Sequence, residues 1–133
     1  MPKKLTTRQR AIKAGYRSGL EEQTAKALKK KKIKFSYELL KIKWEDFKIR
    51  TYTPDFQLPN GIIIETKGRF TAADRRKHLE IQRQYFSGYD IRFVFSNSRA
   101  KLYKGAKSSY GDWCKKNNFL YADKEIPQEW IDE

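Results

Sequence analysis

The sequence predicts an α/β domain in which a mixed β-sheet is flanked by helices. Segments rich in β-branched and aromatic residues take turns along the chain with segments whose apolar residues recur at helical spacing. A Pro-Asn-Gly turn at residues 59–61 joins two of the strand-like segments into a hairpin. The resulting order is helix, strand, hairpin, helix, strand, helix, strand. With 133 residues, the chain has room for one domain with a modest core.

The first 17 residues are basic and lack a clean apolar period. We expect an arm over 1–17 that becomes ordered on phosphates, followed by a single domain over 18–133. Ser18-Gly19-Leu20-Glu21 is a capping-box pattern and predicts a helix from residue 18 to about residue 31. Glu21 has two possible roles: it caps this helix, or it adds a third carboxylate to a metal site formed with Asp55 and Glu65. The local pattern favours the cap.

Apolar residues alternate from Ile33 onward, which predicts a strand over 33–43. The alternation then changes phase at Leu40, which indicates a bulge or a change of strand partner. The charged residues that follow contain no Gly or Pro, and we expect a connection over 44–50.

A second helix is predicted from an N-cap at Thr71 to about Phe86, with a stop at Ser87-Gly88. His78, the only histidine, is expected on a solvated or DNA-facing side of this helix. The remaining expected elements are a strand over 91–95, a loop over 96–109, a helix over 110–116, a strand over 119–121 and a final turn anchored by Trp130.

The hairpin brings acidic residues together. If Leu58 pairs with Ile62, Asp55 lies opposite Glu65, with Cβ atoms ~5 Å apart. Because side chains alternate along a strand, Lys67 joins Glu65 on one face and Thr66 points to the other.

Two carboxylates this close repel each other unless a cation lies between them. Mg²⁺ is the fitting ion, because it prefers oxygen ligands and accepts one or two carboxylates together with phosphate oxygens. A lysine two residues away can orient the attacking water or offset phosphate charge, which is the chemistry of phosphodiester hydrolysis. The alternative is a surface hairpin with an ordinary cluster of charges.

The net charge of +14 favours a polyanionic partner, and nucleic acid is the expected one. Residues 1–35 carry 12 basic side chains against 2 acidic ones. Charge alone also fits a protein that only binds nucleic acid.

The aromatic content of 14% argues against a disordered chain, and no apolar run or signal pattern directs the chain to a membrane, so we expect a soluble, intracellular protein. The single cysteine excludes an intrachain disulfide.

Pro54-Asp55, nine residues and then Glu65-Thr66-Lys67 resemble the signature of the restriction-endonuclease-like nuclease superfamily. A longer series resembles the bacteriophage endonuclease I family of Holliday-junction resolvases over residues 15–131. Its segments are Tyr16-Arg17-Ser18-Gly19-Leu20-Glu21, Tyr52-Thr53-Pro54-Asp55-Phe56, Leu58-Pro59-Asn60-Gly61, Glu65-Thr66-Lys67-Gly68, Arg76-Lys77-His78-Leu79, Ser98-Arg99, Lys101-Leu102-Tyr103-Lys104-Gly105, Ser109-Tyr110-Gly111 and Ile126-Pro127-x-Glu129-Trp130-Ile131.

The resemblance implies an endodeoxyribonuclease that cuts four-way junctions and other branched DNA with Mg²⁺ or Mn²⁺, one or two ions per site, and leaves 5′-phosphate and 3′-hydroxyl ends. It places the catalytic set on Glu21, Asp55, Glu65 and Lys67. The implied metal ligands are Asp55, Glu65, Glu21 and the Thr66 carbonyl, which reverses the local interpretation of Glu21. It also implies a role in DNA recombination or host-DNA degradation in the cytoplasm of an infected bacterium.

The resemblance further implies an intertwined homodimer, in which the first helix and strand complete the partner's sheet and residues 44–51 bridge the exchanged segments. The family's bridge can be longer and contain proline, and its C-terminal tail can be basic, whereas this chain ends in Asp132-Glu133. The residues expected to contact DNA are Lys3, Lys4, Arg8, Arg10, Lys13, Arg17, Arg69, Arg76, Lys77, Arg99, Lys101, Lys104 and Lys107. A restriction-like duplex nuclease and a non-catalytic junction- or RNA-binding protein are the alternatives.

Overall fold

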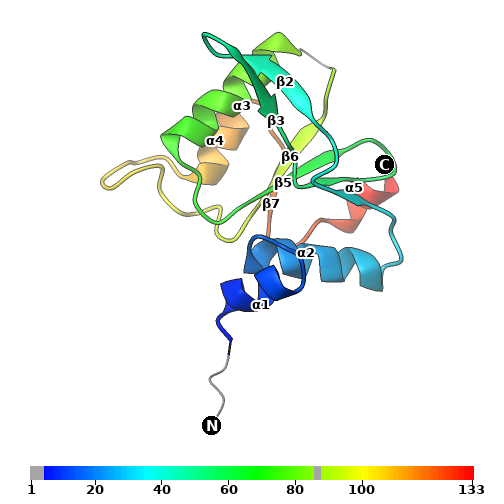
Figure 1. Cartoon of the computed structure of the whole chain (residues 1–133). Helices are drawn as coiled ribbons and strands as arrows, with labels where there is room; N and C mark the ends of the chain where they lie inside the picture. Colours follow the sequence, from blue (N-terminus) through cyan, green and yellow to red (C-terminus); the bar gives the residue numbers. More distant parts are fainter. Residues whose placement is uncertain (1–4, 86–87) are drawn as a thin grey trace.

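A five-stranded mixed sheet forms the centre of the computed structural model, which describes residues 5–85 and 88–133 (Figure 1). In spatial order its strands are β1 (Ser36–Tyr37), β4 (Phe56–Gln57), β5 (Ile63–Lys67), β6 (Ile91–Phe95) and β7 (Tyr121–Asp123). The β1–β4 and β4–β5 pairs are antiparallel, and the β5–β6 and β6–β7 pairs are parallel. The predicted mixed sheet is therefore confirmed.

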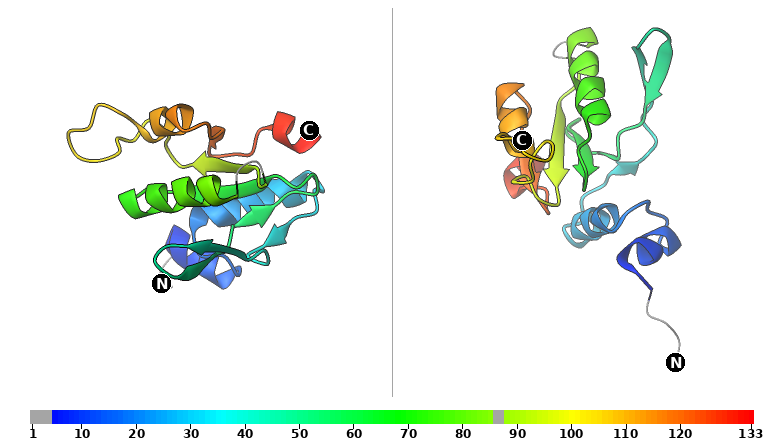
Figure 2. Two further views of the ribbon diagram at one scale, coloured as in Figure 1. Left: turned by 90° about the horizontal axis from the view of Figure 1, so that it is seen from above. Right: turned by 90° about the vertical axis from the view of Figure 1, so that its left-hand side faces the viewer.

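Helices cover both faces of this sheet (Figure 2). Alternation along β5 sends Ile63 to one face, where it packs in a cluster with residues of α3 (Ala72–Gln84) and α4 (Tyr110–Lys116). Its neighbour Ile64 packs on the opposite face with residues of α2 (Gly19–Lys30) and α5 (Gln128–Asp132). The sheet is thus buried on both sides, and the predicted flanking helices are confirmed. Among the described residues, no helix has the length and apolarity needed to span a bilayer.

The β4–β5 hairpin has the register that the sequence predicts. Phe56 pairs with Ile64 and Gln57 with Ile63, and the Leu58 amide donates to the Ile62 carbonyl at 2.9 Å. Gly61 has a φ of +90°, a conformation that favours glycine. The register therefore places residues 55 and 65 opposite each other at the end of the paired segment.

A second, two-stranded sheet consists of β2 (Ile42–Glu45) and β3 (Ile49–Tyr52). The prediction of one strand over 33–43 is wrong, because the backbone leaves the main sheet after Tyr37 and pairs again in the small sheet from Ile42. The phase slip therefore marks a change of partner. The expected irregular connection over 44–50 is also wrong: these residues form most of a hairpin in which Trp44 is buried. A bridging role of 44–51 between protomers stays a prediction.

The N-terminal arm contains a helix, α1 (Thr7–Lys13), so the prediction of an arm ordered only on phosphates is wrong for this segment. Thr6 and Gln9 form a reciprocal capping box, and Ala11 is fully buried. The helix packs closely on the start of α2, where a Cβ on Gly19 would lie 2.1 Å from Thr7 Cγ2. Lys3 and Lys4 lie outside the described residues.

The later elements follow the sequence closely. Thr71 caps α3 with Asp74 at the third position, and α4 spans the predicted residues. The helix α3 ends at Gln84, while Phe86 and Ser87 lie outside the described residues. The predicted strand over 119–121 lies two residues further on, at β7. Trp130 is buried within α5, as expected of an anchor.

Candidate active site

A cavity of about 560 Å³ gathers the residues that the sequence marked for catalysis. It lies where the start of α2 meets the segment before β4 and the end of β5, and residues of α1, β3 and α3 complete its lining. Its lining consists of Arg8, Ile12, Arg17, Glu21, Thr51, Tyr52, Thr53, Asp55, Glu65, Thr66, Lys67 and Lys77. All four candidate catalytic residues and Thr66 therefore share one concave site, which also carries basic side chains.

Glu21 projects from the first turn of α2 and is buried. Ser18 caps this helix by accepting from the Glu21 amide at 3.1 Å. The Glu21 carboxylate does not complete a capping box with Ser18; its Oε1 accepts from the Arg17 amide at 3.3 Å and from the Tyr37 hydroxyl. Burial raises the pKa of Glu21, the Tyr37 hydrogen bond opposes the rise, and the charge of Asp55 adds to it. Glu21 thus faces the acidic site of its own chain.

Asp55 lies one residue before β4 and is buried. Its Oδ2 accepts from the Thr66 amide at 2.9 Å and from the Thr66 hydroxyl at 2.8 Å. Alternation along β5 keeps Thr66 on the face opposite Glu65, as predicted. Asp55 lies beyond the last paired residue of β4, and its carboxylate reaches the Thr66 hydroxyl on that face. Thr66 therefore fixes one oxygen of Asp55.

Glu65 is buried in β5. Burial and the charge of Asp55 raise the pKa of the Glu65 carboxyl well above its usual range, against the opposing influence of Lys67. Its Oε2 lies 3.7 Å from Nε2 of His78 on α3. His78 is fully buried, so the expectation of a solvated or DNA-facing histidine is wrong. Helical phase alone does not reveal that α3 turns this residue toward the sheet.

Lys67 is held at the rim of the site by α3. Its Nζ lies 3.2 Å from Oδ1 of Asp74, the third residue of that helix. Burial would raise the pKa of Asp74, but hydrogen bonds from Thr71 and the charge of Lys67 lower it overall. Asp74 therefore both caps α3 and fixes the position of the candidate catalytic lysine, Lys67.

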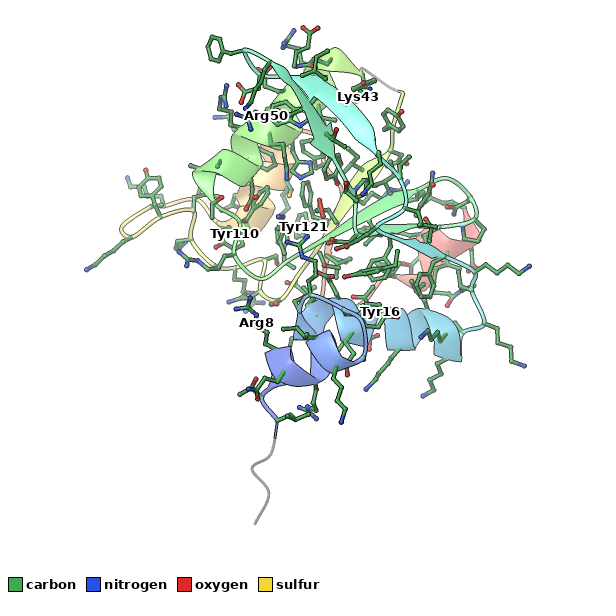
Figure 3. All side chains as sticks on the ribbon, in the orientation of Figure 1. Arg8, Tyr16, Lys43, Arg50, Tyr110 and Tyr121 are labelled. Carbon is green, nitrogen blue, oxygen red and sulfur yellow. The ribbon has the colours of Figure 1, made fainter. Side chains whose placement is uncertain are left out.

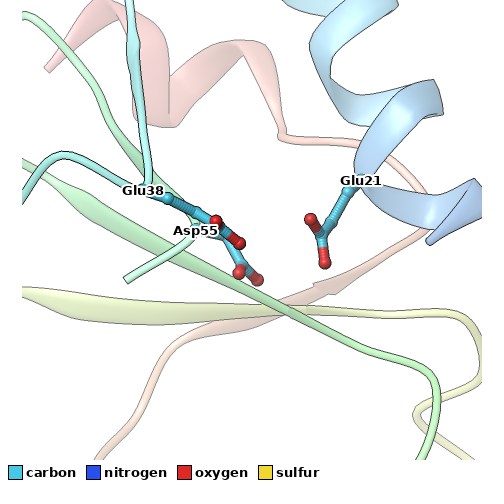
Figure 4. A group of neighbouring side chains, drawn as sticks. All are labelled: Glu21, Glu38 and Asp55. Atoms are coloured by element: carbon cyan, nitrogen blue, oxygen red, sulfur yellow. The ribbon is translucent and has the colours of Figure 1, made fainter. Parts of the chain in front are cut away.

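Glu38 lies beside Glu21 and Asp55, although no local motif pointed to it. Glu21, Glu38 and Asp55 each offer a carboxylate oxygen, and these oxygens lie within 4.8 Å of one another (Figure 4). Glu38 follows β1 with a φ of +53°, and its amide donates to the Asp55 carbonyl at 3.1 Å. Its Oε1 lies 3.5 Å from Arg17 Nη1. Only the pairing of β1 with β4 brings Glu38 to this place. Such an acidic triad can bind a metal ion.

The basic residues expected to contact DNA are distributed unevenly. Arg8, Arg17 and Lys77 line the cavity, and Figure 3 shows Arg8 on α1, far in that view from Arg50 on the β2–β3 hairpin. Arg76 instead pairs with Asp46 of that hairpin, at 3.2 Å from Nη1 to Oδ2. The others expected at the surface are exposed: Arg10, Lys13, Arg69, Arg99, Lys101, Lys104 and Lys107.

Acidic oxygens beside a lysine, in a cavity with basic side chains, are the groups that a metal-dependent nuclease requires. The chain belongs to the phage endonuclease I family, because the family model described as "Phage endonuclease I" matches residues 1–133. It is 53% identical over 119 residues to Endonuclease I of Escherichia phage T7, covering 89% of this chain and 79% of that protein. It is also 53% identical over 119 residues to Endodeoxyribonuclease 1 of Enterobacteria phage T3, covering 89% and 78% of the two chains.

Proposed function

We propose that this protein is a structure-selective endodeoxyribonuclease that resolves four-way DNA junctions by metal-dependent phosphodiester hydrolysis. One observation carries the proposal: in a chain of the phage endonuclease I family, Glu21, Asp55, Glu65 and Lys67 converge on one cavity. The net charge of +14 supports DNA as the substrate, because phosphate contacts dominate affinity for nucleic acids.

The residues of the cavity fit a hard divalent cation. Carboxylate oxygens of Glu21, Glu38 and Asp55 lie within 4.8 Å of one another. Such crowding of negative charge is relieved when a cation lies between them. Carboxylate oxygens suit Mg²⁺, which keeps several of its waters. We propose Mg²⁺, with Mn²⁺ as a substitute and one or two ions per site. Asp55, Glu65 and the Thr66 carbonyl would hold the ion, and Glu21 would support it or its water.

When bound, the ion would lower the pKa of a coordinated water and offset charge on the phosphate. Lys67, held by Asp74, positions or activates the attacking water and contacts a phosphate oxygen. A bond forms between the water oxygen and phosphorus, the bond to the 3′-oxygen breaks, and a proton from the water ends on that oxygen. The products are 5′-phosphate and 3′-hydroxyl ends.

We also propose a homodimer, because resolution of a four-way junction needs two symmetric nicks and a two-fold dimer supplies two sites. An exchange of α2 and β1 between protomers is compatible with the short pairing of β1, which joins β4 through two residue pairs only. After exchange, Glu21 would reach the Asp55 and Glu65 of the partner. Residues 44–51 would then bridge the two halves. We infer a restriction-endonuclease-like arrangement of the sheet and action in the cytoplasm of an infected bacterium.

The proposal is tested by nicking of a labelled four-way junction beside a duplex of the same arm sequence, with and without Mg²⁺, for wild type and Asp55→Asn. We expect metal-dependent, symmetric cuts on the junction and none with Asp55→Asn, which should still bind the junction through its basic residues. Equal cutting of both substrates would show that the protein is a nuclease of duplex DNA without selectivity for junctions. Tight binding without any cutting would show that the protein binds junctions and does not cleave them.

A further inference from the structure

Beneath the carboxylate of Glu65 lies a small group of buried polar side chains. His78 on α3 is fully buried, with Nε2 3.7 Å from Glu65 Oε2. Neither ring nitrogen of His78 has a hydrogen-bond partner within residues 5–85 and 88–133. The rings of Tyr52 and Phe93 hold the imidazole edge-on, with centroids 5.0 and 4.8 Å away.

This arrangement costs stability if His78 serves packing alone. A buried polar group without a partner destabilises the folded state, and His78 presents two such nitrogens. Phenylalanine would fill a similar space between Tyr52 and Phe93 without that cost. Because Nε2 lies 3.7 Å from Glu65 Oε2, the unpaired nitrogen indicates a function at that carboxylate.

The imidazole of His78 can supply the donor in either protonation state. A protonated imidazole donates from both ring nitrogens. A neutral imidazole has one N–H and one acceptor nitrogen. A relative shift of about 0.5 Å would bring the 3.7 Å separation to hydrogen-bond length. Carboxylates that bind metals are commonly fixed in this way by a second hydrogen-bonding group.

We propose that His78 is a positioning residue that donates from Nε2 to Glu65 Oε2 and so turns the other oxygen of Glu65 toward the metal. This inference rests on the proposed metal-dependent function. It goes beyond that function by giving a role to a residue that lies outside the cavity lining and is buried in the core. His78 touches neither DNA nor the ion, and it acts through the orientation of Glu65.

The test is Mn²⁺ binding by the full-length protein without DNA, measured by electron paramagnetic resonance, together with thermal unfolding and the Mn²⁺ dependence of nicking. For His78→Phe we expect Mn²⁺ affinity to fall about 10- to 100-fold while the melting temperature stays the same or rises. His78→Gln, which keeps an N–H donor, should recover part of the affinity. Ile81→Val, one helical turn further on α3 and also buried, is the control for a change in core packing.

Wild-type Mn²⁺ affinity in a folded His78→Phe protein would overturn the inference and assign His78 to packing. His78→Leu provides a second apolar replacement if the phenylalanine variant does not fold, and the same result there would overturn the inference equally. A loss of affinity in Ile81→Val as large as in His78→Phe would also overturn it. If wild type itself binds no Mn²⁺, the proposed function fails and this inference fails with it, so the two failures are distinguishable.

Discussion

The Tyr37 hydroxyl on β1 donates a hydrogen bond to Glu21 Oε1 on α2. Tyr37 is itself held by Tyr16, whose ring packs edge-on against it with centroids 4.8 Å apart. Burial, and then the contact with Glu21, raises the pKa of Tyr37, so the phenol stays protonated as a donor. The helix and the edge strand therefore act together in presenting Glu21 to the site.

Removing this donor should weaken catalysis without removing DNA binding. For Tyr37→Phe we expect the single-turnover nicking rate to fall about 10-fold, because a hydrogen bond to a charged group contributes ~1.5 kcal/mol. Junction affinity, measured by gel shift in EDTA, should stay at the wild-type value. Tyr16→Phe, which keeps the aromatic packing next to the same site, is the control. An unchanged rate in Tyr37→Phe would show that the orientation of Glu21 does not depend on this bond.

Glu38 should contribute to metal affinity. Its oxygen is one of three within 4.8 Å, so Glu38→Gln removes one charge from the acidic triad. We expect a higher Mg²⁺ concentration for half-maximal nicking, by several-fold, and a nearly unchanged rate at saturating Mg²⁺. Glu129→Gln, an exposed change of the same charge, should leave the Mg²⁺ dependence as it is. The same half-maximal concentration in both variants would exclude Glu38 from the metal site.

Asp74 couples the stability of α3 to the position of Lys67. Its carboxylate accepts from the Thr71 amide at 3.0 Å and contacts Lys67 Nζ at 3.2 Å. For Asp74→Ala we expect the free energy of unfolding at pH 7 to drop by about 1 kcal/mol, together with slower nicking. Asp112→Ala removes the equivalent group of the α4 cap. Asp112 does not line the cavity and forms no ion pair with a lysine within residues 5–85 and 88–133, so its replacement should leave the nicking rate unchanged.

The stability effect of Asp74 should depend on pH with a defined sign. The folded pKa of Asp74 is lowered from 3.8, so the folded state binds fewer protons than the unfolded state in this range. The stabilisation is therefore present above pH 3.8 and is lost as the pH falls through the lowered value. Urea unfolding of wild type and Asp74→Ala from pH 6 downward should give a difference that narrows below pH 3.8. A difference that widens on acidification would contradict this assignment.

Segment exchange makes a prediction about mixed dimers. Glu21→Ala and Glu65→Ala homodimers should both be inactive. If Glu21 acts on the partner's Glu65, a mixed dimer refolded from both chains contains one intact site and one site with both defects. We therefore expect the mixture to nick one strand of a four-way junction. A mixture as inactive as its parents would show that each Glu21 serves its own chain.

The sequence was sufficient where structure depends on neighbouring residues. The Pro59-Asn60-Gly61 turn sets the register that puts Asp55 opposite Glu65, because a hairpin loop of defined length leaves one pairing. Thr71 with Asp74 defines the start of α3 by capping chemistry alone. Thr6 and Gln9 form a capping box of the same kind, so the start of α1 could also have been predicted from the sequence.

Contacts between distant segments depend on the tertiary structure and could not be predicted. The pairing of β1 with β4 brings Glu38 next to Asp55, and the packing of α3 on β5 buries His78 against Glu65. The β2–β3 hairpin engages Arg76 through Asp46. The secondary-structure propensity of a segment does not predict these contacts, because each contact depends on how a whole element is placed on the sheet. The family, the hairpin and the candidate catalytic residues follow from motifs in the sequence, whereas the surroundings of each charged group depend on how the elements pack together.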